Sequence, residues 1–371
     1  NTCPVGVCVQ DERLREKFTG TPEKVINLMT YMAEEVREIL ARLGYRSLTE
    51  IIGRTELLRQ VSRGAEHLDD LDLNPILAKV DARDSERSFH IDTPRNEVPD
   101  SLDAEMIDDA KPVFERREKM QLTYTVRNTH RAVGTRFSSE ITAKYGMSVL
   151  NEDHVHIRLR GSAGQSLGAF LCQGITLEVF GDANDYVGKG LCGGKIIVRP
   201  MVSSPLVSQD NTIIGNTVLY GATAGQLYAA GQAGERFAVR NSGADVVVEG
   251  CGANGCEYMT GGNAVILGPV GNNFGAGMTG GMAFILDTEG DFEKMANGES
   301  IVWQRLDSAY WEGHLLALVE RHQQTTDSKW SESILRDWDR WRDRFWQVCP
   351  KEMVHRIDQP LSDRQAIEAA E

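Results

Sequence analysis

A glycine-rich repeat with a period of about twenty residues occupies the middle of the chain and limits how it can fold. The segments ADVVVE, NAVILG and MAFILD begin at Ala244, Asn263 and Met282, at equal intervals along the chain. A short β-branched strand cannot bury its apolar face alone, but a stack of such strands can. The period therefore predicts a β-solenoid over residues 155–287.

Earlier copies of the repeat are also evenly spaced, and the interval between them is one residue longer than the interval between the later copies. VHIRLRG begins at Val155, ITLEVFG at Ile175, and KIIVRP at Lys195 continues the series. We expect one apolar residue of each segment to lie near the core of the stack, namely Ile157, Leu177, Ile197, Val247, Ile266 and Ile285.

The glycines favour a folded scaffold over a flexible linker. Between Gly161 and Gly290 lie 27 of the 36 glycines, and pairs such as Gly193-Gly194 stand just before a strand. Glycine adopts positive φ angles without a Cβ clash, which suits tight corners between strands. A flexible linker would not repeat the apolar triplets VVV, VIL and FIL at a constant spacing.

The overall composition excludes several classes of function. A net charge of −14 disfavours binding to nucleic acid or to an anionic membrane surface. No apolar run approaches the roughly 18 residues that a membrane span needs, and the first residues show no signal-peptide pattern. We expect a cytoplasmic protein of two or three domains, with no nucleic-acid or membrane partner.

Helical patterns flank the repeat on its N-terminal side. Thr21 can cap a helix that Pro22 begins, and apolar residues then recur at steps of three and four. Ser47-Leu48-Thr49-Glu50 has the spacing of a capping box and predicts a second helix. After an acidic, polar connector that starts near Ser101, we expect a strand from Leu122 and a helix that Gly146 ends.

The C-terminal segment is rich in tryptophan, because all six tryptophans lie between Trp303 and Trp346. Ile334, Trp338, Trp341 and Phe345 have the spacing of one helical face. Such a stripe could form a cofactor box or a partner site, but packing against the end of the solenoid or a neighbouring domain is the favoured interpretation.

The cysteines do not form a disulfide framework, since their number is odd and no CxxC pair occurs. Those in and after the repeat are expected to be small buried residues, namely Cys172, Cys192, Cys251, Cys256 and Cys349. Cys3 and Cys8 bracket the turn CPVGVC, a setting that suits an iron-sulfur ligand, but two cysteines alone are weak evidence for a cluster.

Two other polar groups could hold a metal but are better explained by the repeat. Asp182 and Asp185 lack the spacing of an EF-hand and are ordinary turn residues. His154 and His156 share one face of a strand, yet no third ligand is indicated. A half-exposed histidine pair is the simpler interpretation.

Several long blocks resemble the C-terminal portion of glutamate synthase large (alpha) subunits. They are NTCPVGV at Asn1, RAVGTRFSSEI at Arg131, GSAGQSLGAF at Gly161, GDANDYVGKGLCGGKIIV at Gly181, AGERFAVRNSGA at Ala233 and GCEYMTGG at Gly255. The resemblance implies a mainly β fold with a right-handed parallel β-helix. Residues 1–100 would then close an FMN-binding (β/α)8 synthase domain, 101–300 would form the connector and β-helix, and 301–371 a helical tail.

The same resemblance implies the chemistry of the intact enzyme, which makes two glutamates from glutamine, 2-oxoglutarate and reductant. Cys3 would be the last ligand of a 3Fe-4S cluster in a Cys-x5-Cys-x4-Cys pattern, with the other two ligands expected upstream of Asn1. Cys8 falls outside that pattern. The expected partners are the glutaminase, central and synthase domains, and a small NADPH-oxidising flavoprotein subunit with FAD and 4Fe-4S clusters. No catalytic residue is expected in this segment, and ferredoxin remains open as the electron donor.

Two rival interpretations come from other protein classes. A β-solenoid of similar glycine pattern occurs in the C subunit of formylmethanofuran dehydrogenase, a non-catalytic assembly subunit, but that family does not account for NTCPVGV or the N-terminal helices. A polysaccharide lyase or hydrolase on a β-helix would show a carboxylate or basic cluster across neighbouring strands, and the sequence indicates none.

Overall fold

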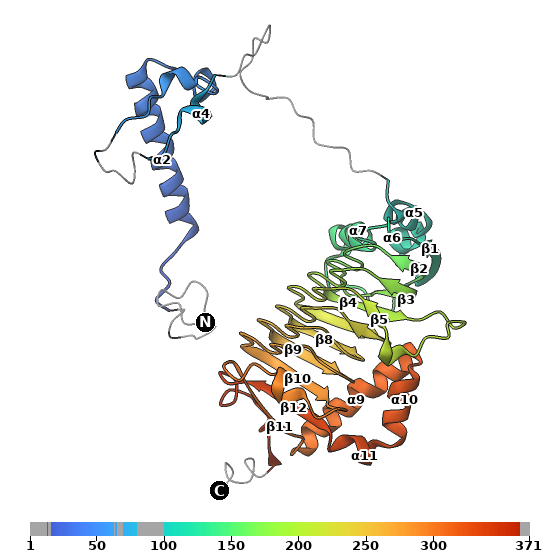
Figure 1. Cartoon of the computed structure of the whole chain (residues 1–371). Coiled ribbons are helices and arrows are strands. Elements are labelled where there is room, and N and C mark those ends of the chain that lie inside the picture. Colours follow the sequence, from blue (N-terminus) through green and yellow to red (C-terminus); the bar gives the residue numbers. More distant parts are fainter. Residues whose placement is uncertain (1–12, 14–15, 63, 65–69, 80–99, 364–371) are drawn as a thin grey trace. The chain divides into compact units, whose positions relative to one another are not determined.

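The computed structural model of the chain describes residue 13 and residues 16–62, 64, 70–79 and 100–363 (Figure 1). The chain divides into two compact units, Asn1–Val98 and Pro99–Glu371. Each unit is described by itself below. None of the described helices is both long and apolar enough to cross a bilayer.

The N-terminal unit is built around one long helix, α2 (Pro22–Leu43), as the sequence predicts. The Thr21 side chain accepts a hydrogen bond from the Lys24 amide at 3.3 Å, and Gly44 ends the helix with a φ of 80°. The apolar face remains open, since Met29 is 60% exposed and Val25 61% exposed. Among the described residues of this unit, that face has no partner that buries it.

The second helix expected after Ser47 is a single 3-10 turn, so that prediction is wrong in extent. The Ser47 side chain caps no backbone amide of this turn, and its hydroxyl instead donates to Glu50 Oε1 at 3.1 Å. The turn ends at Glu50, and Gly53 lies shortly after it with a φ of 75°. The remaining described elements of the unit are short, namely η1 (Leu48–Glu50), η2 (Thr55–Leu57) and α4 (Asn74–Leu77).

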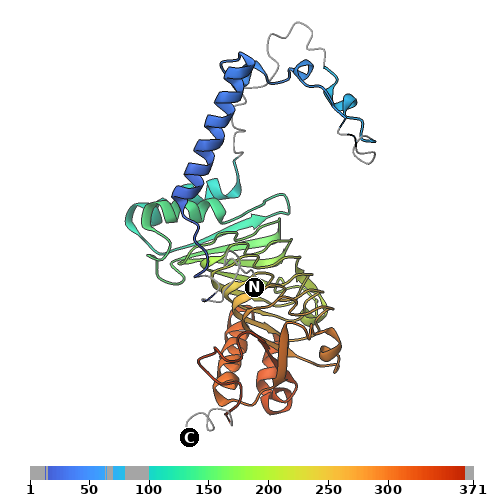
Figure 2. The same cartoon turned by 90° about the vertical axis from the view of Figure 1, so that its left-hand side faces the viewer.

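The larger unit contains a 12-stranded mixed sheet whose main path runs β1-β2-β3-β4-β6-β8-β9-β10-β12-β11. Neighbours from β1 to β10 pair in parallel, and β12 is antiparallel to both β10 and β11 (Figure 2). The strands of the path are β1 (Met120–Val126), β2 (Val155–Ala163), β3 (Ile175–Ala183), β4 (Cys192–Arg199), β6 (Ala224–Ala229), β8 (Ser242–Val248), β9 (Thr260–Ile266), β10 (Gly280–Leu286), β11 (Ile301–Arg305) and β12 (Phe345–Pro350).

The repeats of the sequence are the neighbouring strands of this sheet. Asn263 pairs with Met282, as the equal intervals predict, whereas Asp245 and not Ala244 pairs with Asn263. ADVVVE, NAVILG and MAFILD therefore stack as parallel neighbours, but ADVVVE is one position out of step with NAVILG. Ile157 pairs with Leu177, as the repeat spacing predicts. The predicted stacking of these repeats is confirmed.

Two of the expected core residues lie on the opposite face of the sheet from the others. Leu177 pairs with Ile196 and not with Ile197, because the interval from β3 to β4 is one residue shorter than the interval from β2 to β3. Val247 is likewise one position out of step with Ile266, whose partner is Val248. A slip of a single position turns a side chain to the other face. Ile197 and Val247 are buried, but not beside Ile157.

A repeated bend lies after the strands and explains some of the glycines. In each bend, three residues at alternate positions have φ angles between 53° and 74°, the left-handed region. The sets are Ser166, Gly168 and Phe170; Tyr186, Gly188 and Gly190; Thr217, Leu219 and Gly221; Arg236, Ala238 and Arg240; Asn254, Cys256 and Tyr258; and Asn273, Gly275 and Gly277. Glycine adopts this region at no steric cost, which accounts for its frequency at these positions.

Short strands and bridges form a second ladder beside the main path. β5 (Thr212–Ile214) pairs in parallel with β3 and with β7 (Gln232–Ala233). Parallel bridges continue from Ala233 to Cys251 and on to Val270. Neighbouring repeats are therefore hydrogen-bonded at more than one place along their length.

Helices flank the sheet at both ends of the unit (Figure 1). The acidic connector is helical, with Met106 and Val113 fully buried, and it packs with α7 near the first strands. Near the C-terminus, α9 contacts strands β4, β6, β8 and β9. The helices are α5 (Leu102–Asp109), α6 (Lys111–Arg116), α7 (Thr135–Tyr145), η3 (Ser208–Asp210), α8 (Phe292–Met295), α9 (Ala309–Thr326), α10 (Lys329–Arg336) and α11 (Trp338–Arg342).

The predicted aromatic stripe is a cluster but not one helical face. Ile334 lies in α10, Trp338 and Trp341 in α11, and Phe345 in β12. All four join one apolar cluster with residues of β6 to β10, including Tyr228, Val265 and Phe284. The packing interpretation of the tryptophans is confirmed, and the assumption of a single helix is wrong.

Candidate functional site

The predicted cluster ligand, Cys3, lies outside the described residues, as does Cys8. The five cysteines of the larger unit are free. Burial raises the pKa of Cys251 to about 12 and that of Cys349 to about 11. Metal ligands and nucleophiles need the thiolate form, so Cys251 and Cys349 fit the structural role that the sequence predicts. Cys192, which was also expected to be buried, is only partly buried. No group of three or more His, Cys, Asp or Glu side chains among the described residues could hold a metal ion.

The predicted histidine pair divides between two environments. His154 precedes β2 and is buried, whereas His156 is partly exposed on the face of the sheet. His156 Nε2 lies 2.9 Å from Glu178 Oε2, and Arg158 Nε donates to the same oxygen at 3.1 Å. Burial alone would raise the pKa of Glu178, but His156 and Arg158 together hold that pKa below its usual value. Of the two histidines, His156 is therefore part of an ion network with Glu178 and Arg158.

Asp185 lies in a bend after β3, as expected, but Asp182 lies within β3 itself, so the expectation of a turn residue is wrong for Asp182. The Ser162 hydroxyl donates to Asp182 Oδ2 at 3.0 Å, and Asp185 Oδ1 accepts from the Asn216 amide at 2.8 Å. Both contacts join neighbouring repeats. These carboxylates therefore add side-chain hydrogen bonds between neighbouring repeats.

A buried polar cluster joins the sheet to the C-terminal helices. Glu249, directly after β8, and His322 of α9 are both fully buried, with Glu249 Oε1 at 3.4 Å from His322 Nε2. The Ser328 hydroxyl donates to the same carboxyl oxygen and accepts from the Ser331 amide at 3.1 Å. The group contains the residue types of a hydrolase triad, but here serine contacts the carboxyl and not the imidazole, and solvent is excluded. It fits a role in holding α9 and α10 on the sheet.

Replacing Ser328 by alanine should test that role. The substitution removes a hydrogen bond to a buried carboxyl and the N-cap of α10, so we expect the free energy of unfolding to fall by about 2–4 kcal/mol. Ser333→Ala is the matched control, because the Ser333 hydroxyl donates only to the Trp330 carbonyl within the same helix. Urea denaturation followed by circular dichroism measures both. Equal losses in the two variants would contradict the role.

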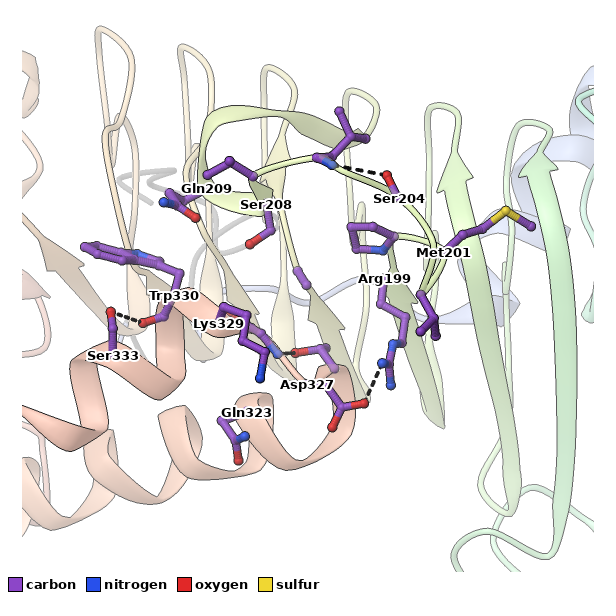
Figure 3. Close-up of a pocket in the computed structure, with 17 residues that line it drawn as sticks. Arg199, Met201, Ser204, Ser208, Gln209, Gln323, Asp327, Lys329, Trp330 and Ser333 are labelled. Carbon is purple, nitrogen blue, oxygen red and sulfur yellow. Dashed lines mark hydrogen bonds and ion pairs between the residues drawn. The ribbon is translucent and has the colours of Figure 1, made fainter.

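A cavity of about 710 Å³ in the larger unit lies between an insertion loop, residues 200–211, and the turn that joins α9 to α10 (Figure 3). Ser204, Ser208 and Gln209 line it from the loop, and Gln323 and Lys329 line it from the helices. The loop interrupts the repeat, since Ile196 pairs with Leu227, well beyond one period along the chain. The insertion therefore builds one wall of the cavity.

Comparison with known proteins places the chain in a family. The model of the family described as "GXGXG motif" matches residues 103–351. The chain belongs to the GXGXG-motif family. Alternate glycines of that kind occur in the bends at Gly188-x-Gly190 and Gly275-x-Gly277. A second model, described as a conserved region in glutamate synthase, matches residues 1–46.

Curated relatives cover the whole chain. The chain is 64% identical over 369 residues to the glutamate synthase (NADPH) large chain of Azospirillum brasilense. This alignment covers 100% of this chain and 24% of the relative. It is 44% identical to the glutamate synthase (NADPH) large chain of Bacillus subtilis, over 99% of this chain and 25% of the relative. Against ferredoxin-dependent glutamate synthase 2 of a Synechocystis strain, the identity is 45% over 94% of this chain and 23% of the relative. The chain thus spans about a quarter of the length of these relatives.

Sequence reasoning missed both the buried cluster and the cavity. Glu249 closes the ADVVVE repeat and resembles an ordinary strand-end residue, and its partners stand more than 70 positions away. The cavity had a usable signal in the sequence, namely the break in the repeat after KIIVRP. A segment inserted between two stacked strands has to leave the sheet, and such loops are where binding sites concentrate.

Proposed function

We propose that this chain is the C-terminal part of a glutamate synthase large chain. The intact enzyme would convert L-glutamine, 2-oxoglutarate and reductant to two molecules of L-glutamate. The observation that carries the proposal is the 64% identity to the Azospirillum brasilense large chain along the full length of this one. NADPH is the donor that we propose, and the cytoplasm the compartment. The ferredoxin-dependent relatives, at 42–45% identity, make ferredoxin the alternative donor.

The proposed layout assigns residues 1–100 to the end of an FMN-binding (β/α)8 synthase domain. The glutamate synthase model at residues 1–46 supports this, as does the open apolar face of α2, which suits a helix that packs on a barrel outside this chain. Residues 101–300 would form the connector and a right-handed β-helix, and 301–371 the C-terminal tail, in which α9, α10 and α11 lie between the strands β11 and β12. In-register parallel neighbours and a second ladder support the β-helix. An experimental structure of the chain tests its handedness.

The segment would act as a rigid spacer and supply one cluster ligand. A stack of hydrogen-bonded strands can hold the glutaminase and synthase domains of the large chain at a fixed separation, which an internally transferred intermediate such as ammonia requires. Cys3 is the residue that we propose as a 3Fe-4S ligand, with the small flavoprotein subunit delivering electrons through the cluster to FMN. When bound, FMN supplies hydride for the reductive step.

The isolated chain should form no glutamate and should bind no stoichiometric flavin. The physical reason is that the described part of the N-terminal unit, one open helix and three short turns, cannot enclose an FMN-sized ligand, of which a binding site usually buries about 70–90% of the surface. The absorbance spectrum of the purified 371-residue chain measures the flavin. A flavin content near one equivalent would contradict the proposed layout.

The activity itself is tested in the intact large chain that carries this segment. With glutamine, 2-oxoglutarate and the small subunit present, NADPH should support glutamate formation. Reduced ferredoxin serves as the comparison donor. Absence of glutamate formation with both donors would overturn the proposed function, whereas activity with reduced ferredoxin alone would change only the donor.

A further inference from the structure

We propose that the cavity between the insertion loop and the α9–α10 turn binds a small organic anion, with Arg199 holding the acidic group. The ligand class is an amphipathic molecule that carries one carboxylate or phosphate on an apolar body. The proposal concerns a site remote in sequence from Cys3, and it does not depend on the proposed function. The volume of the cavity, about 710 Å³, lies within the range of roughly 300–1,000 Å³ that small-molecule sites occupy.

Arg199 is positioned to receive an anion. It is the last residue of β4, and its side chain is only 15% exposed. The guanidinium carbon lies 5.3 Å from the centre of the Phe180 ring, which fixes the plane of the group. Its buried Nε has no hydrogen-bond partner among the described residues. A guanidinium that is already oriented loses little entropy when it binds a carboxylate or phosphate.

The present partner of Arg199 is an exposed carboxylate that a ligand can replace. Arg199 Nη2 pairs with Asp327 Oδ2, and the Asp327 side chain is 63% exposed at the end of α9 (Figure 3). Exposed ion pairs contribute only about 0–1 kcal/mol. A bidentate ligand anion would engage more of the guanidinium donors than Asp327 does and would leave Asp327 free to turn into solvent.

The rest of the lining suits an anion with an apolar body. Lys329 adds a second cation, paired at 2.9 Å with Glu332 Oε2, and the first turn of α10 lies at the cavity, where the helix dipole favours negative charge. The apolar part of the wall comes from the insertion loop, where Met201 and Leu206 are exposed. Both cations have an exposed carboxylate partner that a ligand anion can replace.

Fluorescence titration of the full 371-residue chain tests the proposal with two probes that differ in one charged group. The probes are 1-anilinonaphthalene-8-sulfonate and the neutral N-phenyl-1-naphthylamine. Arg199→Gln should raise the Kd of the sulfonate about tenfold, the loss of roughly one charge-assisted hydrogen bond, and should leave the Kd of the neutral probe unchanged. Asp327→Asn should lower the Kd of the sulfonate several-fold, because it removes the competing carboxylate.

The matched control is Arg160→Gln. Arg160 pairs in register with Phe180, as Arg199 does on the other side, but it is exposed and lies outside the cavity. Circular dichroism confirms that each variant is folded. If Arg199→Gln unfolds the chain, the titration of Asp327→Asn tests the proposal by itself. An ion pair with a purely structural role predicts no gain in affinity for the sulfonate probe when Asp327 is replaced. An unchanged or raised Kd in Asp327→Asn overturns the proposal, as does an equal effect of Arg199→Gln and Arg160→Gln.

Competition identifies the acidic group. Benzoate and phenyl phosphate share an apolar ring and differ in the anion, so the one that displaces the sulfonate probe at lower concentration indicates the natural head group. Displacement by either compound supports the site. If neither displaces the probe from the unsubstituted chain, the cavity does not recognise organic anions and the proposal fails.

Discussion

Replacing Ile266 by aspartate should reduce the free energy of unfolding by about 4 kcal/mol or more, a large part of the roughly 5–15 kcal/mol that typically stabilises a domain. Ile266 is fully buried at the end of β9, between Val248 and Ile285 of the neighbouring strands. Aspartate would leave a void and would place a carboxyl group where its neighbours are apolar. Urea denaturation followed by circular dichroism measures the loss.

The matched control for Ile266→Asp is Val202→Asp. Val202 is also β-branched and aliphatic, but it is 86% exposed in the insertion loop. The same carboxyl group should therefore change stability there by no more than about 0.5 kcal/mol. An unchanged denaturation midpoint for Ile266→Asp, or an equal loss in both variants, would show that β9 does not pack between β8 and β10 as described.

The repeat made the main part of the fold predictable because it is a local signal. Strands with the same β-branched pattern at a constant period stack as parallel neighbours, and ADVVVE, NAVILG and MAFILD do so. Prediction of the facing side chains failed where the pairing departs from that period. The pairing shifts by a single position between β3 and β4 and again between β8 and β9, so Ile197 and Val247 were assigned to the wrong face.

The flanking elements show the limit of local signals in a different way. Thr21, Pro22 and Gly44 determine the ends of α2 by contacts within a few residues, and these were predictable. The capping pattern at Ser47 can begin a helix only if the residues after Glu50 keep the helical conformation. Gly53 instead adopts a left-handed conformation. The buried cluster of Glu249, His322 and Ser328 depends on how α9 and α10 pack on the sheet, which no spacing in the sequence records.

Replacing Cys3 by serine in the intact polypeptide should abolish the proposed 3Fe-4S cluster. Serine is a harder and far less acidic ligand than a thiolate, so the iron would lose one of its three protein ligands. Cys8→Ser is the matched control, because Cys8 is close to Cys3 in the sequence but lies outside the ligand pattern. Electron paramagnetic resonance of the oxidised proteins measures the cluster, and we expect its signal to be lost in the first variant and retained in the second.

The loss of the cluster should separate two activities of the intact enzyme. Electron delivery from NADPH to FMN should fall with the cluster signal, since the proposed route passes through it. Glutamine hydrolysis should persist in part, because its nucleophile belongs to a different domain. A normal cluster signal in Cys3→Ser, or a lost signal in Cys8→Ser, would show that the ligand is the other cysteine. In that case the CPVGVC turn would bind iron through its second thiolate, and the proposed ligand spacing would be wrong.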